Sequence, residues 1–129
     1  LLNYHFDKVS MDLRNLSAKS SFNIEFEPSG VFDKDKSQYL LTFKFTAKDD
    51  GTGREVVSVN CVALYMFKGV NSIEEIPAFF YNNAIAILFP YIRAFVSTVT
   101  LQANIKPILL PTLNLSDLQD RLKENTRNV

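Results

Sequence analysis

Side chains of the kinds that catalyse reactions or bind metals are few and scattered in this sequence. His5 is the only histidine and Cys61 the only cysteine. A catalytic Cys–His pair or a zinc site needs further partner residues of these kinds. In addition, Cys61 stands in an apolar run typical of a buried strand. The acidic residues fall on polar strand faces or in turns, and the four glycines form no phosphate-binding loop. We therefore predict no catalytic residue, no metal site and no cofactor, and we expect that the protein is not an enzyme.

Length and charge restrict the remaining classes of function. The chain has 129 residues, which we interpret as one domain over residues 1–129. Its 14 basic and 14 acidic side chains cancel, so neither a nucleic-acid partner nor an anionic membrane surface is expected. One cysteine permits no internal disulfide, and the first residues show no secretory pattern. A cytoplasmic location is therefore expected.

The most distinctive stretch covers residues 76–115. Between Ile76 and Ile105 the only charged residue is Arg93. The apolar residues fit a helix, but they occupy more than one of its sides, so more than one side has to be covered. A membrane span is not predicted, because the uncharged run 76–92 is shorter than the roughly 20 residues that a span needs and contains two prolines. We expect a partner subunit to cover part of this helix, at Phe89, Tyr91, Ile92, Phe95 and Val96.

Local signals mark the ends of this helix and the segments after it. A capping box at Ser72–Glu75 should open it, and Pro90 should kink or break it, because proline lacks the N–H that the helix needs. A loop between Pro107 and Pro111 follows. A second short helix opens near Ser116, and the tail after Lys123 is expected to fray. In this second helix, Leu118 and Leu122 are expected to face inward, and Asp117 is expected to pair with Arg121.

Alternation of apolar and polar residues predicts four antiparallel strands upstream of the long helix. The alternation reverses near Asp7 and Lys8, which predicts a bulge or a sharp bend in the first strand. The segment 28–30 should interrupt the second strand, and residues 49–53 should form a hairpin turn. The expected fold is therefore α+β: a four-stranded antiparallel sheet, a long kinked helix, a proline-flanked crossover loop and a short C-terminal helix. The predicted strands are residues 4–13, 22–27, 39–47 and 54–67.

The chain carries a surplus of large apolar side chains, with eleven phenylalanines and five tyrosines. Core packing and contacts between subunits explain most of them. Alternatively, some of them line a groove for an extended apolar polypeptide. The segment 106–115 favours the groove, because leucines and isoleucines are held there between two prolines, in a loop that should lie near the surface.

Two motifs resemble a known family. Residues 88–93, with the sequence LFPYIR, resemble the Leu-Phe-Pro-Tyr-Ala-Arg helix motif of SecB, the bacterial export chaperone. Residues 111–118 are similar to that family's proline-containing loop and the start of its last helix. The resemblance implies a tetramer built as a dimer of dimers, which binds unfolded preproteins along hydrophobic grooves without ATP or a cofactor. By analogy the groove residues are Tyr65, Phe67, Leu109, Leu110, Leu113, Leu115 and Leu118.

The sequence departs from this family where SecB presents an acidic sheet surface to the translocation ATPase SecA. The two positions of acids in the first strand fall on Lys8 and Asp12, and Asn60 stands where the fourth strand should carry an acid. The family's basic metal-binding tail has no match after Arg121. Docking on SecA is therefore not expected to carry over.

The leading hypothesis is a SecB-like, ATP-independent holding chaperone that binds unfolded preproteins, possibly in protein export. Two alternatives stay open. One is a SecB-like chaperone dedicated to a single client, such as an antitoxin. The other, from a different class, is a structural or interaction module that uses the same apolar surface only to oligomerise.

Overall fold

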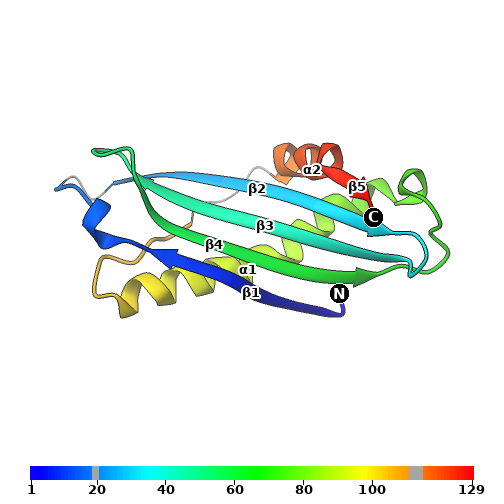
Figure 1. Ribbon diagram of the computed structural model, residues 1–129, viewed down its shortest axis with the longest axis horizontal. Helices are drawn as coiled ribbons and strands as arrows, with labels where there is room; N and C mark the ends of the chain where they lie inside the picture. Colours follow the sequence, from blue (N-terminus) through cyan, green and yellow to red (C-terminus); the bar gives the residue numbers. More distant parts are fainter. Residues whose placement is uncertain (19–20, 111–114) are drawn as a thin grey trace.

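The computed structural model describes residues 1–18, 21–110 and 115–129 (Figure 1). In these ranges the elements are β1 (Asn3–Met11), the 3₁₀ turn η1 (Leu13–Asn15), β2 (Phe22–Asp33), β3 (Gln38–Asp49), β4 (Glu55–Met66), the 3₁₀ turn η2 (Ile73–Glu75), α1 (Ala78–Gln102), α2 (Leu115–Glu124) and β5 (Thr126–Asn128). The order across the sheet is β1-β4-β3-β2-β5, so β1 lies beside β4 and not beside β2. The α+β class is confirmed, with β5 as a small fifth strand that the sequence did not predict.

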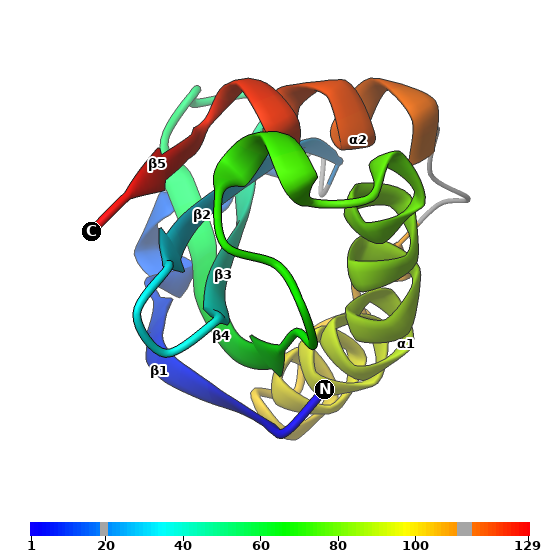
Figure 2. The ribbon, with the colours of Figure 1, turned by 90° about the vertical axis from the view of Figure 1, so that its right-hand side faces the viewer.

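Helix α1 covers one face of the sheet, and α2 lies at the β2 edge (Figure 2). Near the start of α1, Phe80 packs on Tyr39 of β3 and Tyr65 of β4, with ring centroids 4.9 and 5.2 Å apart. Further along, Phe95 stacks on Phe6 of β1 at 4.0 Å. Helix α1 therefore crosses the sheet obliquely, from β3 and β4 toward the β1 edge.

The strands form because alternate residues are apolar and face α1. In β3 the residues predicted to face one way are fully buried, and their partners in β4 are buried beside them. Side chains of paired residues point to the same face of a sheet, so these rows form one continuous core layer. The buried residues of this layer are Tyr39, Leu41, Phe43 and Phe45 in β3, and Val59, Cys61, Ala63 and Tyr65 in β4.

The predicted bulge in β1 is confirmed. The register with β4 shifts between Phe6 and Lys8. Before the shift Phe6 pairs with Cys61, and after it Val9 pairs with Val59, so the reversed alternation still turns apolar side chains toward α1.

The predicted interruption of β2 at residues 28–30 is wrong, because β2 continues through Pro28 to Asp33. The Pro28 carbonyl oxygen accepts a hydrogen bond from Asn125 Nδ2 at 3.2 Å, on the side away from β3. In an antiparallel pair the N and O of one residue face the same neighbour. The missing N–H of Pro28 therefore faces the outer edge of β2, where it costs no bond to β3.

Helix α1 begins later than predicted. Ser72 makes no side-chain cap, and only the short turn η2 follows it, although the Glu75 carboxylate does accept from the Asn71 N–H at 3.0 Å. Ile76 precedes Pro77 and takes an extended conformation, which residues before proline favour. The first turn therefore stops, and α1 starts at Ala78. No break follows at Pro90.

Among the described helices, α1 alone has the length and apolar composition of a membrane span. The side of α1 that faces the sheet carries buried residues of the core, among them Ala84, Leu88 and Ile92. Core helices of folded domains have the same composition.

The tail is ordered, not frayed as predicted. β5 pairs in parallel with residues 30–32 of β2, and the Val129 N–H donates to the Phe32 carbonyl at 3.0 Å. Thr126 Oγ1 lies 2.6 Å from the Tyr39 hydroxyl. As predicted, Leu118 and Leu122 are buried, and they fix α2 against the sheet.

Gly30 should be indispensable for this packing. A Cβ atom at residue 30 would overlap the buried Tyr39 ring, which lies directly on it. We expect Gly30→Ala to lower the free energy of unfolding by about 1–3 kcal/mol, the usual cost of overpacking a core. Urea denaturation measures it, with the exposed neighbour Ser29→Ala as the control. Equal stability of the two variants would contradict the assigned contact.

Candidate functional site

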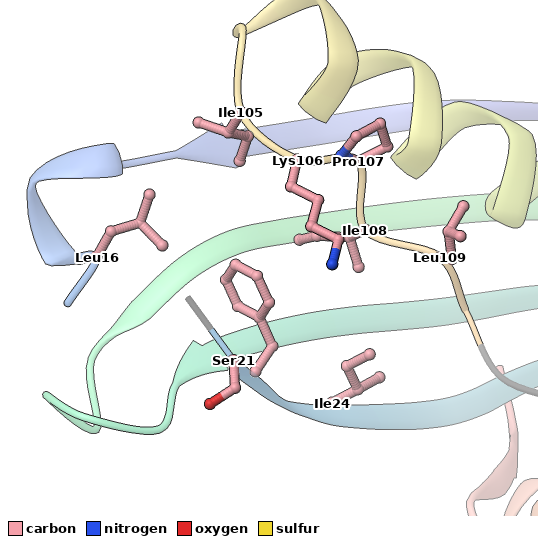
Figure 3. Close-up of a pocket in the computed structure, with 9 residues that line it drawn as sticks. Leu16, Ser21, Ile24, Ile105, Lys106, Pro107, Ile108 and Leu109 are labelled. Carbon is pink, nitrogen blue, oxygen red and sulfur yellow. The ribbon is translucent and has the colours of Figure 1, made fainter. Parts of the chain in front are cut away.

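An apolar opening lies between the start of β2 and residues 105–110, which we call the crossover segment. Its volume is about 390 Å³. Figure 3 shows the crossover segment on one side of it and β2 with Leu16 on the other. This first pocket is lined by Leu16, Ser21, Phe22, Ile24, Ile105, Lys106, Pro107, Ile108 and Leu109.

Hydroxyl groups of α1 hold the crossover segment in place. Thr100 Oγ1 accepts from the Ile108 N–H at 3.0 Å, and Ser97 Oγ donates to the Ile108 carbonyl at 3.1 Å. Ile108 and Leu110 are thereby turned into the core, at 4% and 1% exposed. Leu109, between them, is 73% exposed at the pocket rim. The alternation of side chains along an extended segment therefore presents one leucine to solvent.

Asp49 fixes the opposite wall. Its side chain is buried and accepts from the Ser17 N–H at 3.0 Å, from Ser17 Oγ at 3.1 Å and from the Thr52 N–H at 2.8 Å. The bond from the Ser17 N–H is the main reason why the pKa of Asp49 is lowered to about 2. These bonds tie residue 17 to the β3–β4 turn, and so place Leu16 at the pocket.

A second pocket of about 410 Å³ adjoins the first along β2, since Ile24 lines both. Its walls come from α2, where Leu118 is buried and Arg121 donates to the Phe26 carbonyl. The predicted Asp117–Arg121 pair is confirmed at 3.6 Å. We call the two adjoining pockets the β2 groove. The remaining lining residues of the second pocket are Glu25, Phe26 and Glu27.

The structure separates the residues that the resemblance had grouped. Leu109 lines the first pocket and Leu118 the second. Leu110, the last residue of the crossover segment, is buried in the core. Tyr65, buried, and Phe67, half-buried, lie at the other end of the sheet, where β4 pairs with the start of β3. Leu113 and the side chain of Leu115 fall outside the described residues.

Four of the five predicted interface residues face the sheet more than the solvent, whereas Tyr91 stacks on Tyr4 and is still 43% exposed. Ile92 and Val96 are fully buried within the subunit. Tyr91, Phe95 and Phe89 contact the aromatic side chains of Tyr4, Phe6 and Phe26, respectively. The side of α1 that faces away from the sheet exposes other apolar residues, namely Phe79, Ile87 and Leu101, together with Tyr91.

Sequence reasoning missed most of the first pocket. Phe22 and Ile24 were predicted on the apolar face of a strand, and they do lie there. What the pattern could not show is that this strand end is left uncovered by α1. The clustering of Ile105, Pro107 and Ile108 just after the helix was the only signal for the opposite wall.

Comparison with known proteins decides the family. The family described as preprotein translocase subunit SecB matches residues 8–125. The chain belongs to the SecB family. It is 32% identical over 128 residues to the protein-export protein SecB of Magnetococcus marinus, covering 88% of this chain and 81% of that protein. It is 26% identical over 123 residues to an uncharacterized protein of Methanocaldococcus jannaschii, covering 93% and 79%.

A solved SecB-like chaperone shares the fold. It comes from Mycobacterium tuberculosis and was solved in complex with a ChAD peptide from the HigA1 antitoxin. The TM-score is 0.62 at 20% identity, and the match covers 87% of this chain and 88% of that one.

The outer face of the sheet differs from the acidic surface implied for SecB. Lys8, Asn60 and Lys44 are paired across β1, β4 and β3, so they form one row on the face away from α1. Among the described residues no group of three or more His, Cys, Asp or Glu side chains could hold a metal ion. Burial raises the pKa of the Cys61 thiol to about 11, so at neutral pH this cysteine stays protonated.

Asp49 should make stability depend on pH. Its folded pKa of about 2 lies below the ordinary value of 3.8, so its contribution is complete above pH 3.8 and disappears as the pH falls toward 2. We expect Asp49→Asn to be less stable than the parent at pH 6 and to approach it as the pH falls to 2.5. Urea midpoints across this range test it, with the exposed Asp50→Asn as the control. A constant difference between parent and Asp49→Asn would contradict the assignment.

Proposed function

We propose that this protein is an ATP-independent holding chaperone that binds extended apolar segments of unfolded polypeptides in the β2 groove. The observation that carries the proposal is the open first pocket, whose lining is mostly aliphatic and aromatic and whose rim exposes Leu109. Together the exposed leucine and the apolar opening form one contiguous apolar surface, and such surfaces mark interaction sites.

The backbone of β2 supports this mode of binding. The carbonyls of Phe26 and Pro28 face the outer edge of β2, where Arg121 and Asn125 bond to them. Because backbone direction alternates along a strand, the N–H and C=O of Ile24 face the same edge. β5 reaches only residues 30–32, so within the described residues this part of the edge is open beside the first pocket. An extended client gains backbone bonds there, whatever its sequence.

No nucleotide is needed for holding. Binding to the unfolded chain and not to the folded one shifts the folding equilibrium of the client by mass action. The M. tuberculosis relative was solved with a peptide from an antitoxin, which supports a polypeptide client in general. A dedicated client and a broad range of preproteins are both compatible with a groove that recognises apolar side chains and backbone.

We also infer that the subunits assemble through the outward side of α1, into the tetramer that the resemblance implies. Phe79 is 66% exposed and Leu101 58%, and Ile87 lies between them on the same side. Arg93 is the only charged residue of α1. An apolar side of this length is typical of a subunit contact.

Leu109→Asp should abolish most client binding without unfolding the protein. Burying a leucine on binding is worth roughly 1.5–3 kcal/mol, so we expect the affinity to fall at least about ten-fold. The ligand is a reduced and alkylated polypeptide that cannot fold, titrated with fluorescence anisotropy as the readout, and its folded form is the negative control. Met66→Asp is the matched control, since Met66 is 53% exposed at the far end of the sheet. Equal affinity of both variants would place the client elsewhere.

Ile87→Asp should lower the assembly size and leave the secondary structure unchanged, because the side chain is exposed in the subunit but covered in the assembly. Light scattering at micromolar concentration measures the size, and circular dichroism controls for the fold. An unchanged size would show that α1 does not form the contact.

A further inference from the structure

The first pocket carries a single charged side chain. Of the nine residues that line it, only Lys106 is charged. Figure 3 shows this side chain extending from the crossover segment across the opening toward β2. Within the described part of the chain, no ion pair includes Lys106. Its ammonium group is therefore a positive charge beside an apolar surface, with no carboxylate from these residues to pair with it.

The carboxylates near the opposite wall are not available to Lys106. Asp49 is buried, and its two carboxylate oxygens accept hydrogen bonds from Ser17 and Thr52. Asp50 is exposed in the β3–β4 turn and forms no printed ion pair with Lys106. A carboxylate that pairs with Lys106 has therefore to come from a bound client.

Strand pairing decides where this carboxylate stands in the client. Phe22 and Ile24 both line the first pocket and pack against the core on the α1 side of the sheet. Paired strand residues point to the same face, so a client strand beside the open edge of β2 turns every second side chain toward the pocket. Two such side chains lie about 7 Å apart along the strand, as those of Phe22 and Ile24 do. The pocket therefore spans two inward positions of the client.

The client side chains between these positions point to the outer face of the sheet. They lie beside Asn23 and Glu25, and Glu25 already pairs with Lys48 at 3.7 Å. A client carboxylate there faces away from Lys106 and lies next to the Glu25 carboxylate. Like charges on neighbouring strands are unfavourable.

We propose that the first pocket selects client segments with an apolar and an acidic side chain two residues apart, the apolar one beside Leu109 and the acidic one against Lys106. A second apolar side chain in that place would cover the ammonium group without a partner, which costs free energy. The aliphatic stem of Lys106 remains part of the apolar wall. Lys106 is then a specificity determinant. This inference rests on the proposed chaperone function and narrows its client class.

Labelled peptides with blocked ends test the spacing. Each has one apolar anchor and one glutamate, placed either two residues or one residue from the anchor, on each side in turn, and a neutral peptide has glutamine instead. With fluorescence anisotropy, we expect a glutamate two residues away, on at least one side, to bind roughly two- to five-fold more tightly than glutamate one residue away or glutamine, the range of exposed ion pairs. Equal net charge removes any general attraction from the first comparison. The preference should shrink at 500 mM salt, since exposed charges are screened.

Charge reversal identifies the residue. Lys106→Glu should lose the preference for glutamate and prefer a lysine at the same place in the peptide, while its affinity for the neutral peptide stays that of the parent. The matched control is Lys68→Glu, because Lys68 is exposed after the end of β4, which pairs with the start of β3, whereas the first pocket lies beside the end of β3. This variant should bind all the peptides as the parent does.

The outcomes separate this inference from the function beneath it. If the parent binds neither the peptides nor a permanently unfolded polypeptide, the chaperone function is wrong. If the parent binds them but does not distinguish the two spacings, or if Lys106→Glu keeps the preference for glutamate, the groove holds clients without this selection, and the inference is overturned.

Discussion

The fold depends on how helix α1 covers a sheet that is wider than the helix. An α-helix with its side chains is about 10–12 Å across, whereas four strands spaced about 4.8 Å apart extend further. Helix α1 crosses obliquely, from Tyr39 and Tyr65 at its start to Phe6 near its end. At the end of the sheet where β2 begins, α1 has already reached the opposite edge. The apolar strip left there has to be covered by something else.

Two separate segments cover this strip, and they leave part of it open. Hydroxyls of Ser97 and Thr100 bring the crossover segment back over the sheet, and α2 is fixed further along β2 by Leu118 and Leu122. The β2 groove is the space between β2 and these two covers. It is a consequence of incomplete coverage, and the walls of its first pocket are held by hydrogen bonds of Ser97, Thr100 and Asp49, none of which lines that pocket.

Much of this fold could be predicted from the sequence, because buried strands and helices show their periods directly. The core face of β3 and the bulge beside Lys8 were predicted from alternation alone. Pro28 misled the prediction, because its effect depends on which edge of β2 its nitrogen faces. β5 was missed because the polar triplet 126–128 has no apolar period and owes its place to Asn125 and Val129.

The groove was harder to predict than the fold. A loop between prolines indicated an exposed apolar segment, and Leu109 meets that expectation. The opposing residues Phe22 and Ile24 looked like ordinary core, since no local pattern tells whether a helix reaches the end of a strand. Whether a helix covers the end of a strand depends on three-dimensional distances, and a family motif in α1 gives no information on these distances.

The hydrogen bonds along the outer edge of β2 give the groove one blocked end and one open end. From Phe26 onward this edge is occupied by Arg121, by Asn125 and by β5. Toward Phe22 nothing in the described residues pairs with it. For the proposed client chain, α2 therefore closes the path in one direction, and within the described residues the other direction stays open, toward the β3–β4 turn.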